Sequence, residues 1–284
     1  MAPWFARLGS AWMILAAASF AAMSLLVARS SQQLGAVEIL FYRTFIGLLV
    51  LLPPVLLGRE RVATVHWSGH LKRSLAGYVS MALLFYALAH LPLATAVTLN
   101  YTSSLSFAVC CVLLRGDRLG HLVKMALLLG FVGIVLILRP TFDQGQWLAG
   151  LAGLLSGVGA GLALFHVREL GELGERPGVT VFWLYCLSTV CGLVWVLLQG
   201  GFTPLAVSDL GLLLAMGLLG LLGQLAMTRA YKEGRKFVVS SLAYLTVVFS
   251  ALLGVVFGGQ LLSLTALLGM AMIIACGMLA AKGS

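Results

Sequence analysis

The sequence predicts an all-α integral membrane protein with ten transmembrane helices, arranged as two inverted five-helix repeats. Three observations predict this fold class: the composition, the spacing of the apolar segments and a similarity between the two halves of the chain. Of the 284 residues, 61% are hydrophobic and 10% are charged, whereas soluble domains carry about a quarter charged residues. So few charges cannot cover a water-facing surface, and so many apolar residues exclude a disordered chain.

Ten segments are apolar over nearly the length that a helix needs to cross a bilayer, which is about 20 residues. In chain order they predict helices over residues 10–28, 35–57, 72–90, 94–114, 121–138, 147–170, 179–199, 209–231, 237–257 and 264–281. Charged residues, glycine or proline separate the segments. Basic residues mark most of the separators, in order Arg29, Arg59, Arg115, Arg139, Arg176 and Lys232. The first segment follows a short basic start, as a signal peptide does, but the repeat described below requires it as a retained helix.

The basic residues distinguish the two sides of the membrane. With ten spans, 15 of the 18 lysines and arginines fall on the side of the amino terminus, including Lys72 and Arg73 at the start of the third span. The other 3 are Arg29, Arg139 and, deeper in the second span, Arg43. Because basic loops stay in the cytoplasm, we expect a multi-pass protein of the cytoplasmic (inner) membrane with both termini cytoplasmic. This bias explains the net charge of +9 better than nucleic-acid binding does.

The two halves of the chain resemble each other at a constant offset. Four pairs of identical residues are 143 positions apart, namely Tyr42 and Tyr185, Gly77 and Gly220, Ala87 and Ala230, and Tyr101 and Tyr244. The offset predicts a first repeat over residues 1–140 and a second over residues 141–284. Each repeat holds five helices, and because five is odd the second enters the membrane upside down. Inverted repeats of this kind place a substrate site near the midplane and permit alternating access.

Several stretches carry a family resemblance. They are Glu38–Arg43, Tyr86–Val97 and Leu99–Ser103 in the first half, and Gln224–Tyr231 and Ser240–Leu245 in the second. On these residues the chain resembles the EamA-type family of the drug/metabolite transporter superfamily, over nearly its whole length. The resemblance implies a ten-helix secondary transporter. The family usually has a proline after the Tyr-Thr-Ser of the fourth helix, where this chain has Ser104, so we expect helix four to be straighter.

Polar residues deep in apolar segments are costly and therefore mark candidate binding sites. Tyr101 and Tyr244 are repeat mates that offer an aromatic face and a hydroxyl to a planar or cationic ligand. Asn100 is the only asparagine in the chain, and its amide needs partners. The predicted substrate-binding residues are Tyr101, Asn100, Tyr244, Thr98, Thr102, Gln224, Ser241 and Tyr78.

Five of these residues also have a structural interpretation. The two tyrosines fit an ordinary core, and Asn100 fits a role in helix packing. Thr98 and Thr102 share a helix stripe with Thr95 and Ser106, whose hydroxyls either line a water-filled path or bond to carbonyls of their own helix. For Arg43 we expect bonds to carbonyls of a neighbouring helix, with anion binding as the alternative. Gly153, Gly157 and Gly161, spaced by four residues, indicate close helix packing.

Together these patterns predict a secondary active transporter, and not an enzyme, that moves a small organic metabolite by alternating access. A polar path with tyrosines suits an amino acid, an amine or a nucleoside-like compound, and the resemblance adds S-adenosylmethionine as a candidate. The alternatives are an organic-anion or drug exporter of the same fold, and after these a channel or a membrane-embedded enzyme. We expect no cofactor and no metal ion, because the chain has no P-loop and no HExxH motif, and its five cysteines form no CxxC pair. The expected partners are a small-molecule substrate and the lipid bilayer, with the protein as monomer or homodimer and without nucleic acid.

Overall fold

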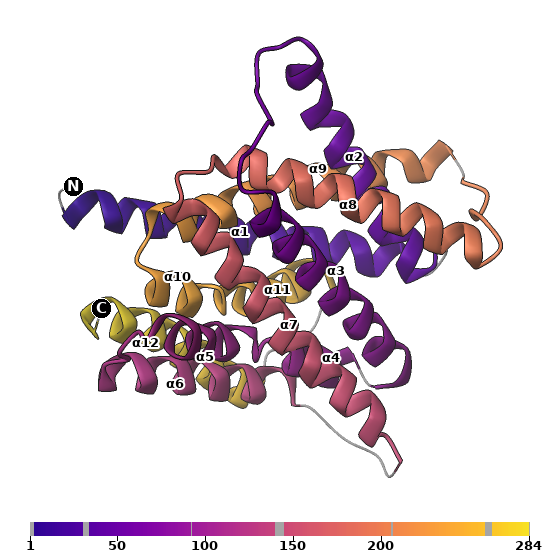
Figure 1. Ribbon diagram of the computed structural model, residues 1–284. Coiled ribbons are helices and arrows are strands. Elements are labelled where there is room, and N and C mark those ends of the chain that lie inside the picture. Colours follow the sequence, from indigo (N-terminus) through magenta and orange to yellow (C-terminus); the bar gives the residue numbers. More distant parts are fainter. Residues whose placement is uncertain are drawn as a thin grey trace.

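The structure, a computed structural model, describes residues 3–30, 34–91, 93–139, 145–205, 207–258 and 263–283. Over these ranges it is helical and contains no strand (Figure 1). The helices are α1 (Pro3–Ser30), α2 (Ala36–Leu56), α3 (Trp67–His90), α4 (Leu93–Asn100), α5 (Ser103–Arg115), α6 (His121–Leu138), α7 (Trp147–Glu172), α8 (Pro177–Leu198), α9 (Val207–Glu233), α10 (Lys236–Leu242), α11 (Leu245–Gly258) and α12 (Leu264–Gly283). The predicted boundary between the repeats, at residues 140 and 141, lies outside the described residues.

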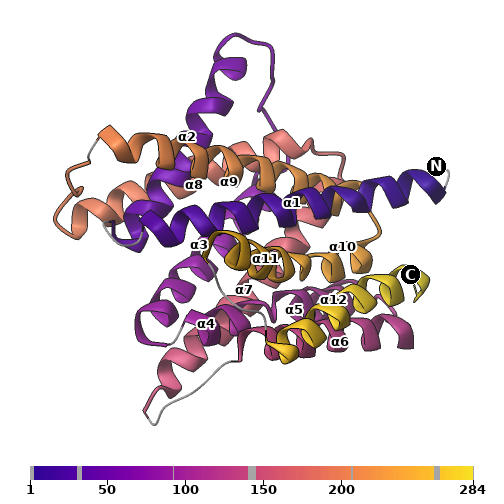
Figure 2. The ribbon, with the colours of Figure 1, turned by 180° about the vertical axis from the view of Figure 1, so that it is seen from behind.

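These helices form the ten predicted spans, because two of the spans consist of two helices each. Nine of the described segments are long and apolar enough to cross a membrane, and two of them join α4 to α5 and α10 to α11. The tenth predicted span corresponds to α3, which has 24 residues but carries Lys72 and Arg73 in its second turn. Both termini lie at the same end of the molecule, as Figures 1 and 2 show, in keeping with an even number of spans.

The fourth span is interrupted at Tyr101 and Thr102, so the expectation of a straighter helix four is wrong. The backbone N–H of Thr102 donates to the carbonyl of Leu99, three residues back, at 3.2 Å. The hydroxyl of Thr102 donates to the same carbonyl at 2.7 Å. A hydroxyl that competes for a backbone carbonyl tightens the local turn, and the helix is therefore interrupted without a proline.

The ninth span is interrupted in the same way at Ala243 and Tyr244. There the hydroxyl of Thr246 donates to the carbonyl of Ala243 at 2.9 Å. The interruptions coincide with the repeat mates Tyr101 and Tyr244, so the two halves share a break at the same place. The two broken spans also meet: the hydroxyl of Ser104 donates to the carbonyl of Ser240 at 2.9 Å, and that of Ser240 donates back at 3.2 Å.

The most extensive helix contacts join the two halves of the chain. The helix α6 packs along α12, α3 packs along α7, and α9 packs along α1. Under the offset of 143 residues, the α3–α7 contact corresponds to the α9–α1 contact, so the pairing follows the repeat. Neither half therefore buries its apolar surface without the other.

The three glycines of α7 pack against the fourth span on both sides of its interruption, which confirms their predicted packing role. A Cβ atom on Gly157 would lie 2.6 Å from the carbonyl oxygen of Leu99, and one on Gly161 would lie 2.7 Å from the backbone nitrogen of Phe107. A Cβ on Gly153 would meet the side chain of Leu99 at 2.8 Å. Only residues without a side chain allow the interrupted backbone to come this close to α7.

Candidate functional site

Asn100 lies at the end of α4 and connects it to α7. Its Nδ2 atom donates to the hydroxyl of Ser156 at 3.1 Å, and that hydroxyl donates to the carbonyl of Gly153 at 2.6 Å. The amide thus has a partner in the protein, beside the interrupted backbone. Asn100 remains partly exposed, so a ligand can still reach it despite this contact. Its binding role stays a prediction.

Tyr101 and Tyr244, which are repeat mates, lie in the same region of the core. Both belong to one apolar cluster of α6, α11 and α12. Tyr244 is fully buried, and its hydroxyl donates to the carbonyl of Leu127 at 3.5 Å. Its ring lies over Gly130 of α6, where a Cβ atom would be 2.6 Å from Cε2. Tyr101 is partly buried at the margin of this cluster, so Tyr101 is the more accessible of the two.

The remaining predicted residues are dispersed. Thr98, Gln224 and Ser241 are all buried, and the hydroxyl of Ser241 has no hydrogen-bond partner among the described residues. Tyr78 of α3 lies apart from them and makes an edge contact with Trp195 of α8, with ring centroids 6.4 Å apart. The structure therefore gathers Tyr101, Tyr244 and Asn100 near the broken spans, and the binding roles of all eight residues remain predictions.

A second polar cluster, which the sequence did not predict, lies where α2, α3, α8 and α9 meet. It consists of Arg43, Arg73 and Tyr185, and we call it the arginine cluster. Arg73 is 5% exposed. Its Nη1 atom lies over Gly77, where an added Cβ atom would be 2.6 Å from it. Arg43 lies over Gly220, where a Cβ would be 2.9 Å from Nε. The Tyr185 hydroxyl interacts with Arg43 and lies in the electrostatic field of Arg73.

The arginine cluster carries two positive charges that no described carboxylate pairs in an ion pair. Neither arginine forms an ion pair with a described residue, and both Nε atoms and the Tyr185 hydroxyl are buried without a hydrogen bond of good geometry. Arg43 reaches no carbonyl of a described residue, so the expectation of such bonds is wrong. The signal that could have located the cluster is the repeat pair Gly77 and Gly220, because each glycine lies beneath one arginine.

The helices α7 and α9 are held together at the end that carries the termini. The Nη1 atom of Arg168 donates to the carbonyls of Tyr231 at 2.6 Å and of Gly234 at 3.0 Å. From the other side, Nζ of Lys232 donates to the carbonyl of Glu175 at 2.7 Å. The two helices converge toward this end and diverge toward the opposite end (Figure 1). Their repeat mates, α1 and α3, form no comparable contact among the described residues.

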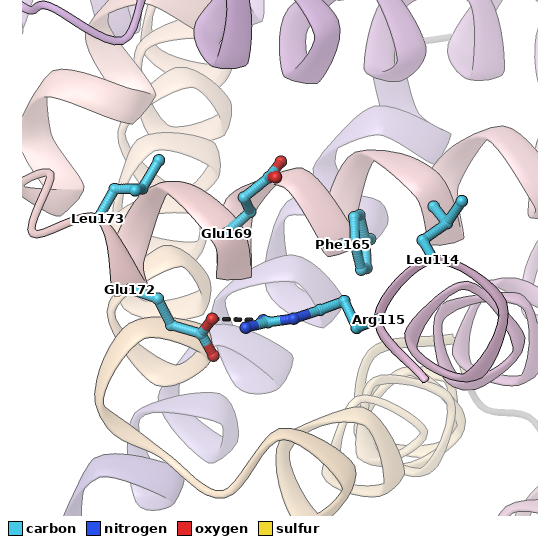
Figure 3. Close-up of a pocket in the computed structure, with 6 residues that line it drawn as sticks. All are labelled: Leu114, Arg115, Phe165, Glu169, Glu172 and Leu173. Atoms are coloured by element: carbon cyan, nitrogen blue, oxygen red, sulfur yellow. Dashed lines mark hydrogen bonds and ion pairs between the residues drawn. The ribbon is translucent and has the colours of Figure 1, made fainter. Parts of the chain in front are cut away.

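A shallow pocket of about 400 Å³ lies beside this contact, between α5 and α7. Figure 3 shows Arg115 directed toward Glu172, with which it forms an ion pair. Glu172 also accepts from Nε of Arg168 at 2.7 Å. Because Arg115 and Glu172 pair with each other and the pocket opens at the surface, we do not assign it as the substrate site.

Comparison with known proteins decides the family. The sequence profile of the EamA-like transporter family matches the chain twice, over residues 7–139 and 147–280. The chain belongs to this family. Its members include proteins similar to this chain that are named as transporters, so the protein is a multi-pass membrane transporter and not an enzyme.

Individual relatives agree with this assignment. The chain is 31% identical to the "Pseudopaline exporter CntI" of Pseudomonas aeruginosa, over 93% of this chain and 92% of the relative. It is 29% identical to the "Riboflavin transporter" of Rhizobium johnstonii, over 80% of this chain and 75% of the relative. A protein of known crystal structure superposes with a TM-score of 0.79 at 22% identity, covering 96% of each chain, which shows that the fold is shared.

Proposed function

We propose that the protein is a secondary active transporter that moves a small organic metabolite across the cytoplasmic membrane by alternating access. The observation that carries this proposal is the unequal contact of repeat-related helices. At the end with the termini, Arg168 and Lys232 join α7 to α9, whereas the repeat mates α1 and α3 form no comparable contact among the described residues. Inverted repeats that differ in this way are expected when a transporter is closed on one side and open on the other.

Exchange of the two contacts would open the molecule to the opposite side. In that state the α7–α9 contact separates, and α1 and α3 approach each other at the opposite end. The breaks at Tyr101 and Tyr244 give each half one interrupted helix in which backbone angles change without breaking an intact helix. We place the end with the termini in the cytoplasm, because most lysines and arginines lie at that end, and we propose a monomer or homodimer.

The names of the relatives do not determine the substrate, because one is an exporter of pseudopaline and another is a transporter of riboflavin. The proposed classes are an amino acid, an amine or a nucleoside-like compound, including S-adenosylmethionine. The arginine cluster favours the alternative of an organic anion, or the members of these classes that carry a carboxylate.

A metabolite screen on purified protein tests the proposal in two steps. Thermal unfolding, followed by tryptophan fluorescence, identifies solutes that stabilise the protein. Counterflow in proteoliposomes then measures whether unlabelled solute inside accelerates entry of the labelled solute. A carrier accelerates this exchange, and an open channel does not. Stabilisation by a solute that shows no accelerated exchange would contradict the transporter mechanism.

A further inference from the structure

The charges of the arginine cluster are not neutralised from within the described protein. Glu38 is five residues from Arg43, but its carboxylate accepts from the backbone N–H of Gly35 at 3.1 Å and from the hydroxyl of Thr203 at 2.9 Å. The other acidic side chains whose ion pairs are described bind elsewhere, namely Glu60, Asp117, Glu169, Glu172, Glu175 and Glu233. The arginine cluster therefore receives no negative charge from any of these carboxylates.

A buried guanidinium group without a partner destabilises the folded state, because it has lost its water and gained no bond in exchange. The guanidinium group of Arg73 is such a group. Arg73 is 5% exposed, and no described group accepts a hydrogen bond from it. Unfavourable buried charges of this kind persist where the charge has a function. An anionic ligand would supply the missing interaction.

The position of the cluster suits a transported solute. Gly77 and Gly220 are repeat mates, on α3 and α9, and each leaves the space that one guanidinium occupies. The two arginines therefore lie on corresponding sides of the pseudo-twofold axis that relates the halves. A ligand between them contacts α2, α3, α8 and α9, which are helices of both repeats, so its binding is sensitive to their relative movement.

The chemistry of the cluster selects the ligand group. A guanidinium presents two N–H donors in a planar fork that matches the two oxygens of a carboxylate. Tyr185 is 1% exposed, and its hydroxyl adds a third hydrogen-bond donor group to the two guanidinium groups. We propose that Arg43, Arg73 and Tyr185 bind a carboxylate group of the transported metabolite. This inference rests on the proposed transport function, and it restricts the substrate to organic acids and to amino acids or derivatives that retain their carboxylate.

Matched acids and amides test this proposal on the full chain in lipid nanodiscs. The probes are carboxylated metabolites, each compared with its primary amide, among them succinate with succinamide, L-glutamate with L-glutamine and L-methionine with L-methioninamide. We expect an acid to raise the melting temperature of the wild-type protein and its amide to have no effect. If no acid is preferred over its amide, the proposal is overturned.

The variant Arg73→Met removes the buried charge and keeps an unbranched side chain of adaptable shape. We expect the stabilising acid to bind at least about 10-fold more weakly, because a bond to a charged group is lost. We also expect the ligand-free variant to melt at a higher temperature than the wild type, because an unpaired buried charge is gone. A residue with a purely structural role would not raise it. Unchanged acid binding by this variant overturns the proposal.

Arg118→Met is the matched control, because Arg118 is exposed and the same charge is removed. We expect it to change neither acid binding nor the melting temperature. If Arg73→Met does not fold, Arg73→Lys retains the charge without the planar fork, and we expect the acid to bind about 10-fold more weakly. Equal acid binding by Arg73→Lys and wild type then counts against the proposal.

The two proposals fail in different ways. Counterflow of a neutral solute or an amine that Arg73→Met leaves unchanged would support the transporter and overturn the carboxylate site. Stabilisation by an acid that Arg73→Met abolishes, without exchange of that acid in proteoliposomes, would support the carboxylate site and contradict the transport mechanism.

Discussion

The contact between α7 and the interrupted fourth span predicts that Gly157→Ala destabilises the protein. The added Cβ would lie 2.6 Å from the carbonyl oxygen of Leu99 and would also contact the hydroxyl of Thr102. Backbone atoms cannot rotate away as a side chain can, so α7 and the break must separate. Overpacking of this kind costs about 1–3 kcal/mol. One kcal/mol shifts the melting temperature of a chain of comparable size by about 2–4 °C, so we expect a fall of about 2–12 °C.

The assay is thermal unfolding of the purified protein in nanodiscs, with Gly211→Ala as the matched control. Gly211 lies in α9, is exposed, and would bring its Cβ near no other atom. Alanine is the better helix former there, so we expect Gly211→Ala to be neutral or stabilising by less than about 1 kcal/mol. Gly153→Ala should be intermediate, because its Cβ meets a flexible leucine side chain. Equal melting temperatures for Gly157→Ala and Gly211→Ala would refute the close packing of the break.

Three further tests address separate contacts. Arg168→Gln removes bonds to three carbonyls at the end of α9, so we expect the contact between α7 and α9 to weaken by about 1 kcal/mol and hydrogen exchange in α9 to increase near that end. Unchanged exchange there would contradict a role in closing that end. For the reciprocal bonds between Ser104 and Ser240, a double-mutant cycle with alanine should give a coupling of about 0.6 kcal/mol, and additive melting shifts would show that the bonds contribute nothing. If Asn100 binds substrate, Asn100→Ala should abolish ligand stabilisation in the thermal screen. Ser156→Ala, which removes only the hydrogen-bond partner of Asn100, should retain that stabilisation. Equal losses in the two variants would indicate that Asn100 has only a packing role.

The sequence predicted the ten spans and the glycine packing of α7 because both depend on residue properties that repeat along the chain. Apolar length identifies a span, and glycine at four-residue spacing identifies a close contact. The breaks could not be predicted in the same way, because threonine is common within helices and interrupts one only when its hydroxyl takes the backbone carbonyl. Thr102 does so at 2.7 Å. The only signal in the sequence was that Tyr101 and Tyr244 correspond in the two repeats.

The arginine cluster was missed for a related reason. Arg73 lies six residues after the start of α3 at Trp67, and a count of charges by side places it with the exposed cytoplasmic residues. Its side chain instead extends along α3 toward Gly77 and is buried between helices that are distant in sequence. Burial of this kind depends on tertiary packing against α7 and α8, which the charge pattern does not contain.

Distances between helices at the two ends of the molecule test alternating access most directly. In a cysteine-free variant, spin labels at Leu173 and Glu233 report on α7 and α9 at the end with the termini, and labels at Ser24 and Tyr86 report on α1 and α3 at the opposite end. All four positions are exposed. With a solute that shows counterflow, measured by pulsed electron spin resonance, we expect the 173–233 distance to lengthen while the 24–86 distance shortens. Distances that both stay constant, or both change in the same direction, would contradict the mechanism.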